Sequence, residues 1–157
     1  MFIENLNDSK KILEKNRNKI FRKIIKSCRC WSVAKVSPHV LDRITLGKAN
    51  VLVIKKAISR LKIKPDIVIT DAVYAKMDKF GIEVIPIING DELSASIAAA
   101  SIVAKVIRDR IMVKLSRIYP EYDFKTNKGY GTKKHMLVLQ KYGPSKIHRI
   151  SFKGVLK

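Results

Sequence analysis

The chain contains 157 residues, of which 33 are Lys or Arg and 13 are Asp or Glu, so its formal net charge is +20. This length suits one domain with a hydrophobic core and leaves too little chain for two. No apolar run approaches the roughly 20 residues that span a bilayer, and residues 1–10 lack the apolar segment of a signal peptide. We therefore expect a monomeric, cytoplasmic protein with a single domain over residues 1–157 and no membrane segment.

The strong positive charge favours a polyanionic partner, because each phosphate that a cation neutralises releases condensed counterions. Nucleic acid is the preferred partner, and a merely solvated basic surface, reflecting a genome rich in Lys, Ile and Asn, is the alternative. Cys28 and Cys30 are the only cysteines and stand too close together for a comfortable disulfide. No second Cys or His pair has zinc-site spacing, so we expect free thiols.

Helices and one strand are predicted for the first 61 residues. Asp8 or Ser9 is a good N-cap for a first helix that ends near Lys26. Residues 28–36 alternate between polar and apolar side chains, which predicts a strand. Ser37-Pro38 is typical of a helix start, and a longer helix is predicted over residues 46–61.

Two nearly continuous apolar runs follow, at residues 66–73 and 82–88. Such runs are typical of strands that are covered on both faces of a sheet. Asp71 stands near the carboxyl end of the first run. Pro86 cannot donate to a strand ladder, which favours an edge strand or one that ends early.

Residues 85–112 form the stretch around which the rest of the chain is organised. After the second apolar run, the chain turns at Asn89-Gly90, presents Asp91, and enters a long helix of small and aliphatic residues. Side chains that small allow close approach to a sheet, and backbone N–H groups near Asp91 could meet an anionic ligand. An Ala-rich core helix after a turn is the alternative. The helical spacing predicts a buried stripe of apolar residues, namely Ile97, Ala100, Ala104, Ile107, Ile111 and Leu115.

Tyr119-Pro120 ends this helix, and residues 121–132 are predicted to form a polar loop. A final helix is expected over about residues 133–142, with Gly143-Pro144 as its stop signal. The three histidines are scattered along the chain, and each by itself is more often a surface or hydrogen-bonded residue than a metal ligand.

Strands that alternate with helices indicate an α/β sheet with helices on its faces. In such sheets ligands bind beyond the carboxyl ends of parallel strands. Asp71 and Asp91 both follow predicted strands, so the two carboxylates could converge at one edge. A divalent cation would relieve their mutual repulsion, and oxygen ligands suit Mg²⁺ or Mn²⁺. The structural alternatives are a turn-capping role for Asp71 and a helix N-terminal carboxylate for Asp91.

Carboxylates at a sheet edge within a basic protein suggest phosphodiester chemistry. In the two-metal arrangement, ions about 3.5–4 Å apart activate the attacking water and stabilise the leaving oxygen. For each aspartate by itself, the structural alternative is at least as compatible with the sequence as a metal-binding role. Only the two carboxylates together favour metal binding.

Five segments resemble, in the same order, signature segments of bacterial ribonuclease HII. They are LNDSKKI (6–12), ITDA (69–72), GDELSASIAAASIVAKVIRDRIM (90–112), NKGYGT (127–132) and HRISF (148–152). This resemblance covers nearly the whole chain. It implies an α/β ribonuclease H-like fold, with a mixed sheet flanked by helices and its first strands missing. It also implies an endonuclease that cuts the RNA strand of RNA–DNA hybrids and single ribonucleotides in duplex DNA.

The resemblance also implies roles for individual residues. Asp71 and Asp91 match the third and fourth of four metal-binding carboxylates, with Mn²⁺ or Mg²⁺ as cofactor. Tyr130 matches a tyrosine that stacks on the sugar at the RNA–DNA junction; the alternative is a loop aromatic packed on the surface. The segments that line the nucleic-acid path in the family contain three further residues, Lys10, Ser94 and Lys128.

The sequence departs from the family pattern at its start. The family begins with a hairpin carrying Gly-x-Asp-Glu-x-Gly-Arg-Gly, which supplies the first two carboxylates, and no such segment occurs here. Asn89 and Asn127 also replace a lysine and a histidine of the family. A late start codon and a decaying gene are two explanations. In either case the two apolar runs would expose apolar faces and unpaired strand edges.

Two functions from different classes follow from the sequence. The first is a metal-dependent endoribonuclease that acts on RNA–DNA hybrids or on ribonucleotide-containing duplex DNA. The second is a catalytically inactive basic remnant that only binds nucleic acid through charge. A small structural nucleic-acid protein is disfavoured by the strand-end aspartates and by the order of the motifs.

Overall fold

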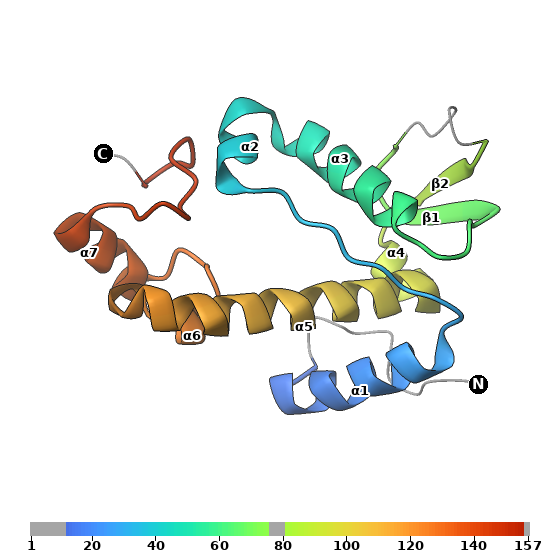
Figure 1. The fold of residues 1–157 in the computed structure, drawn as a ribbon, viewed down its shortest axis with the longest axis horizontal. Coiled ribbons are helices and arrows are strands. Elements are labelled where there is room, and N and C mark those ends of the chain that lie inside the picture. Colours follow the sequence, from blue (N-terminus) through green and yellow to red (C-terminus); the bar gives the residue numbers. More distant parts are fainter. Residues whose placement is uncertain (1–11, 76–80, 156–157) are drawn as a thin grey trace. The chain divides into compact units, whose positions relative to one another are not determined.

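The computed structural model describes residues 12–75 and 81–155 of the chain. Figure 1 shows its helices and strands along the chain. They are, in order, α1 (Glu14–Ser27), α2 (Pro38–Arg43), α3 (Leu46–Ser59), β1 (Ile67–Asp71), β2 (Glu83–Ile87), α4 (Gly90–Leu93), α5 (Ala95–Ile118), η2 (Pro120–Tyr122), α6 (Phe124–Asn127) and α7 (Lys133–Tyr142). In the part of the chain that the structure describes, no helix has both the length and the apolarity needed to cross a bilayer.

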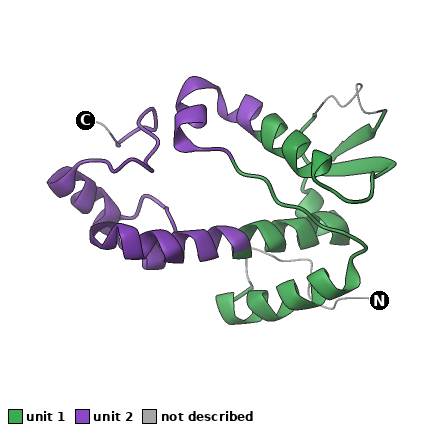
Figure 2. Ribbon diagram, in the orientation of Figure 1, with its two compact units in different colours: residues 1–35, 50–106 green, residues 36–49, 107–157 purple. Residues whose placement is uncertain are grey.

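The chain forms two compact units, which Figure 2 shows in different colours. Unit 1 comprises residues 1–35 and 50–106, and unit 2 comprises residues 36–49 and 107–157. The helix α5 contributes its first half to unit 1 and its second half to unit 2. The single domain expected over residues 1–157 stays a prediction.

The first helix of unit 1 buries an apolar face. Phe21 and Ile24, one turn apart, are its buried residues, and Trp31 packs edge-on against the Phe21 ring at a centroid distance of 6.4 Å. The predicted end near Lys26 is close to the observed end at Ser27. The predicted N-caps lie outside the described residues, and the helix begins at Glu14, later than expected.

The strand predicted for residues 28–36 is wrong. Among the described residues this segment has no strand partner, and its polar groups bond to α3 and the residues after it. The Ser32 hydroxyl donates to the Ala57 carbonyl, and the Arg60 guanidinium donates to the Val33 carbonyl at 3.0 Å. Alternating polarity fits an extended backbone, but a strand also needs a neighbouring strand to satisfy its N–H and C=O groups.

The strands β1 and β2 form a parallel pair in unit 1. Their register runs from Ile67 opposite Glu83 to Asp71 opposite Ile87. Within residues 12–75 and 81–155 each strand has one partner, so Pro86 lies in an edge strand, as predicted. The expectation of coverage on both faces is wrong for these residues, because only Thr70 is buried and Ile67 and Ile85 are exposed.

The long helix predicted after Asn89 is interrupted once. Its first turn is the separate helix α4, and Ser94 has an extended backbone (φ −126°, ψ 121°) before α5 begins. The predicted buried stripe is also shifted, because Ala100 and Ala104 are exposed. Residues 95–104 at the start of this helix contain only two polar side chains, Ser96 and Ser101, so periodicity leaves two stripes open there and packing selects between them. The buried apolar residues of α5 are Ile97, Ala98, Ile102, Val103 and Val106.

Unit 2 is built around an aromatic cluster, in the segment that was predicted to be a polar loop. Tyr122, Phe124 and Leu139 are its buried residues. The rings of Tyr122 and Phe124 stack at 5.4 Å, and the Tyr122 hydroxyl donates to the Gly143 carbonyl at 2.7 Å. The prediction missed the helices η2 and α6 because single turns carry no helical period.

Two of the three histidines meet in this cluster and are not scattered as the sequence suggested. The Nε2 atoms of His135 and His148 lie 3.3 Å apart. The Ser145 N–H donates to His148 Nδ1 at 2.9 Å, so the proton of a neutral His148 is on Nε2. Burial lowers the pKa of His148, and the charge of His135 lowers it further.

The helix α7 agrees with the prediction in both of its bounds, Lys133 and Tyr142. Thr132 is its N-cap, and the Thr132 hydroxyl accepts a hydrogen bond from the His135 N–H at 3.2 Å. Gly143 follows with φ 72°, a backbone conformation that favours glycine. The stop signal Gly143-Pro144 therefore placed the end of this helix correctly.

Candidate active site

One candidate aspartate of unit 1 ends a strand of the parallel pair, and the other lies shortly after the second strand. Asp71 is the last residue of β1, and β2 ends at Ile87, directly opposite it. The Ala72 N–H donates to the Ile87 carbonyl at 3.0 Å, which keeps the two strand ends together. Since parallel strands have their carboxyl ends at one edge, Asp71 and the residues after β2 share that edge.

A turn at Asn89 brings the chain from β2 back towards Asp71. Asn89 has a left-handed backbone (φ 54°, ψ 37°), which asparagine tolerates better than most residues. The helix α4 begins at the next residue, Gly90, whose N–H donates to Asp71 Oδ1 at 3.0 Å. One carboxylate thus binds the backbone of the residue that directly precedes the other candidate, Asp91.

The close approach at this point explains why residue 90 is a glycine. A Cβ atom on Gly90 would lie 2.6 Å from Cδ1 of Ile97, and 3.5 Å from both Asp71 Cα and Ile87 Cβ. The first distance is far below van der Waals contact, so a side chain at residue 90 would force the Ile97 side chain to move. The absence of a side chain therefore allows α4 to pack against the end of β1.

Asp71 and Asp91 differ in their surroundings. Asp71 is exposed, whereas the Asp91 side chain lies in α4 and the residue is only 7 % exposed. A buried carboxylate costs several kcal/mol unless hydrogen bonds or a cation compensate it. The edge of the strand pair thus combines one accessible and one desolvated carboxylate.

The chemistry of this donor set suits a hard divalent cation. Two carboxylates, supplemented by water and substrate phosphate, are a common ligand set for Mg²⁺. Across residues 12–75 and 81–155, no three side chains of the Asp, Glu, His and Cys types gather closely enough to hold a metal by themselves.

The predicted substrate-contacting residues Lys128 and Tyr130 lie in unit 2, in the loop after α6. Lys128 and Gly129 both have positive φ angles, 51° and 83°. Asn127 holds this turn, because its Oδ1 accepts from the Gly129 N–H at 2.8 Å and its Nδ2 donates to the Tyr122 carbonyl at 2.7 Å. The turn leaves Tyr130 58 % exposed.

Arg108 and Asp109 of α5 are functional candidates that the sequence reasoning missed. Arg108 donates to the Tyr130 hydroxyl at 2.7 Å and, through Nε and Nη2, to Asp109 Oδ1 at 3.0 and 2.9 Å. Burial would lower the pKa of Arg108, but its hydrogen bonds to Asp109 and Tyr130 raise it, so the guanidinium stays charged. The available signal was Asp109, the one acidic residue of α5, directly after Arg108.

The structure therefore brings together two sets of predicted residues, each within its own unit. Asp71 and Asp91 lie at the edge of the strand pair in unit 1, and half-buried Ser94 joins α4 to α5 there. Lys128, which is half-buried, and Tyr130 lie in one turn of unit 2. The remaining candidate, Lys10, lies outside the described residues.

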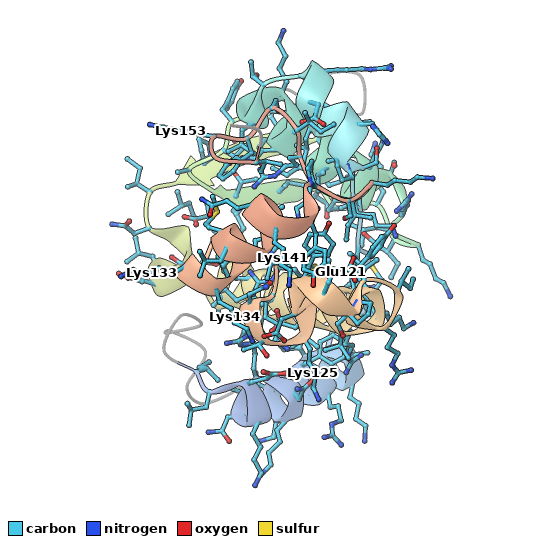
Figure 3. The ribbon with its side chains drawn as sticks, turned by 90° about the vertical axis from the view of Figure 1, so that its left-hand side faces the viewer. Glu121, Lys125, Lys133, Lys134, Lys141 and Lys153 are labelled. Atoms are coloured by element: carbon cyan, nitrogen blue, oxygen red, sulfur yellow. The ribbon has the colours of Figure 1, made fainter. Side chains whose placement is uncertain are left out.

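Basic side chains are frequent on α6 and α7 of unit 2. Figure 3 labels Lys125, Lys133, Lys134 and Lys141 on these helices, with Glu121 in η2 and Lys153 near the end of the chain. Lys134 forms an ion pair with Asp123 at 2.8 Å, and this interaction lowers the pKa of Asp123. The labelled lysines are exposed, so their charge is available to a polyanion.

A solved structure has the same fold. The crystal structure of the ribonuclease H2 from Pyrococcus horikoshii OT3 matches 96% of this chain and 78% of its own, with a TM-score of 0.82 and 23% sequence identity. This comparison places the chain in the ribonuclease H-like fold class and confirms the fold class that the sequence predicted. The sheet of the described residues is the parallel pair β1–β2.

The sequence comparisons identify the family. The family profile described as Ribonuclease HII matches residues 3–155. A protein named Ribonuclease HII from Caldicellulosiruptor bescii is 51% identical over 150 residues, which are 96% of this chain and 72% of that protein. Its counterpart from Lactobacillus gasseri is 47% identical over 96% of this chain and 59% of its own length. The chain belongs to the ribonuclease HII family, and it spans between about three fifths and three quarters of these relatives.

Proposed function

We propose that this chain acts as an endoribonuclease on the RNA strand of RNA–DNA hybrids and at single ribonucleotides in duplex DNA. Family membership supports the reaction class. The observation that carries the proposal is the hydrogen bond from the Gly90 N–H to Asp71 Oδ1, because it places Asp71 beside the residue that precedes Asp91. Two carboxylates at the edge of a parallel strand pair are suited to phosphodiester hydrolysis assisted by divalent metal ions.

Asp71 and Asp91 would hold the divalent cation, Mg²⁺ or Mn²⁺. When bound, two such ions would supply a nucleophile from water and stabilise the charge that develops on the leaving oxygen. The carboxylate of Asp71 has about four acceptor positions, so its bond to Gly90 leaves capacity for a cation. This bond also fixes the orientation of the carboxylate before substrate arrives.

Tyr130 is proposed to recognise the substrate. The residue is 58 % exposed on a turn whose backbone is held by Asn127. A flat aromatic surface can stack on a nucleotide at the RNA–DNA junction. Lys10, Ser94 and Lys128 are proposed to contact the nucleic-acid backbone, and the net charge of +20 supports such a polyanionic partner.

Asp71→Asn tests the metal role separately from the structural role. Asparagine keeps an oxygen that can accept the Gly90 N–H, but it removes the negative charge that a cation requires. We expect Asp71→Asn and Asp91→Asn to lower cleavage of a duplex with one ribonucleotide about a hundredfold or more, since metal assistance contributes several kcal/mol. Asp66→Asn is the matched control, because exposed Asp66 precedes the other end of β1.

The measurement is the rate of strand cleavage in Mg²⁺ and in Mn²⁺, with equilibrium binding measured in parallel. Unchanged cleavage in Asp71→Asn would overturn the metal role. A chain that binds duplexes with strong salt dependence, without any metal dependence or cleavage, would instead match the alternative of a basic protein that only binds nucleic acid.

A further inference from the structure

Arg108 is positioned by a buried carboxylate of unit 2. Its Nε and Nη2 both donate to Asp109 Oδ1, at 3.0 and 2.9 Å, and Asp109 is only 7 % exposed. Neighbouring residues on a helix do not normally face each other, so the Arg108 side chain must fold back along α5 to make these contacts. Two hydrogen bonds to one oxygen restrict the rotation of the guanidinium group.

The remaining end of the guanidinium contacts Tyr130. Arg108 Nη1 donates to the Tyr130 hydroxyl at 2.7 Å, and the guanidinium carbon lies 5.0 Å from the centroid of the Tyr130 ring. A hydrogen bond and a cation–π contact together determine where the hydroxyl lies and which side of the ring Arg108 covers. The rest of the ring stays accessible, since Tyr130 is 58 % exposed.

The direction of this hydrogen bond has a chemical consequence. Arginine is only a donor, so the Tyr130 oxygen is the acceptor and its own proton remains available. An exposed hydroxyl in this state presents a donor to the substrate. It can therefore donate to a group that accepts a hydrogen bond, such as a phosphate oxygen or a sugar oxygen.

We propose that Arg108 is a positioning residue for substrate recognition: anchored on Asp109, it holds the Tyr130 ring so that one side can stack on the nucleotide at the junction and the hydroxyl can donate to a substrate oxygen. This inference rests on the proposed function, because it assumes that Tyr130 recognises the junction. It adds a residue of α5 to the recognition of the ribonucleotide. Asp109 acts through Arg108.

The first experiment measures the contact without substrate. In protein labelled with carbon-13 at the tyrosine ζ position, the Tyr130 signal is identified as the one that Tyr130→Phe removes. We expect Arg108→Met to shift this signal. Arg117→Met should leave it unchanged, because Arg117 is an exposed arginine of the same helix. An unchanged Tyr130 signal in Arg108→Met would overturn the inference, whatever the function of the chain.

The second experiment measures the binding preference for a duplex with one ribonucleotide over the all-DNA duplex, by fluorescence anisotropy at fixed salt. We expect Arg108→Met to lower this preference about tenfold, as befits the loss of a hydrogen bond from a charged donor. Arg108→Lys, which keeps a charge beside Asp109, should fold normally and recover only part of the preference. Circular dichroism reports folding in each variant.

A double mutant tests whether Arg108 acts through Tyr130. In a Tyr130→Ala background, Arg108→Met should cause little further loss, because the hydrogen bond and the cation–π contact between the two side chains are both already absent. Fully additive losses would overturn the positioning role. If Tyr130→Ala leaves the preference intact while Arg108→Met still shifts the tyrosine signal, the proposed recognition by Tyr130 fails, and the inference fails with it.

Discussion

The strand pair of unit 1 and the aromatic cluster of unit 2 differ in how their residues are buried. In β1 and β2 only Thr70 is buried, and Ile67 is 53 % exposed. In unit 2, Tyr122 and Phe124 are 3 % and 2 % exposed and lie in contact with two histidines. Regions with few buried apolar contacts open at low free energy, whereas packed clusters open only near global unfolding. The strand edge thus presents the candidate carboxylates, while the cluster stabilises the unit that carries Tyr130.

The largest effect on stability is expected at Phe124. Phe124→Ala removes a ring that stacks on Tyr122 and should lower the free energy of unfolding by about 3–5 kcal/mol. Ile88→Ala is the control from unit 1, where Ile88 is 77 % exposed, and it should change stability by less than about 0.5 kcal/mol. Urea denaturation followed by circular dichroism provides the measurement. Equal losses in both variants would contradict the contrast between the regions.

Gly90→Ala is expected to have the next largest effect and to act on the strand edge. The new Cβ would lie 2.6 Å from Cδ1 of Ile97, so the variant should lose about 1–3 kcal/mol through overpacking. Ile97→Val removes this Cδ1 atom, and the double variant should be more stable than the sum of the two losses predicts. Strict additivity in urea denaturation would show that the close contact does not limit the position.

A smaller loss is expected when the N-cap of α7 is removed. Thr132→Ala deletes the acceptor for the His135 N–H and should cost about 1 kcal/mol. Ser37→Ala is a matched control, since Ser37 is the N-cap of α2 but makes no side-chain capping bond. The urea midpoint of Thr132→Ala should therefore fall further than that of Ser37→Ala. The reverse order would contradict the assignment of the cap.

The smallest effect concerns the pH dependence of the aromatic cluster. Burial and the nearby His135 lower the pKa of His148 below its ordinary value of 6.5, so the unfolded chain binds more protons than the folded chain below that pH. This contribution to stability is complete above pH 6.5 and is lost as the pH falls. His148→Gln should reduce the decrease in the free energy of unfolding between pH 7.5 and 5.5. Identical urea midpoint shifts in the two proteins would contradict the prediction.

Some elements were predictable because their signals are local. Thr132 and Gly143 mark both ends of α7, and Ser37-Pro38 marks the start of α2. The candidate carboxylates were also visible, since Asp71 and Asp91 follow two apolar runs that form parallel strands. The predictions that were wrong depend on which segments of the chain pack against each other. Residues 28–36 have a strand-like pattern but bond to α3, and the buried face of α5 could not be chosen from its first ten residues, which are nearly all small or apolar.

The order of the motifs by itself determined the family, and the turn and capping residues determined where several elements begin and end. Only the tertiary structure showed that Gly90 binds Asp71, that Arg108 contacts Tyr130, and that His135 meets His148. The physical reason is distance along the chain: these contacts join residues 13 to 22 positions apart. No local pattern encodes such pairings, because they depend on how strands and helices pack.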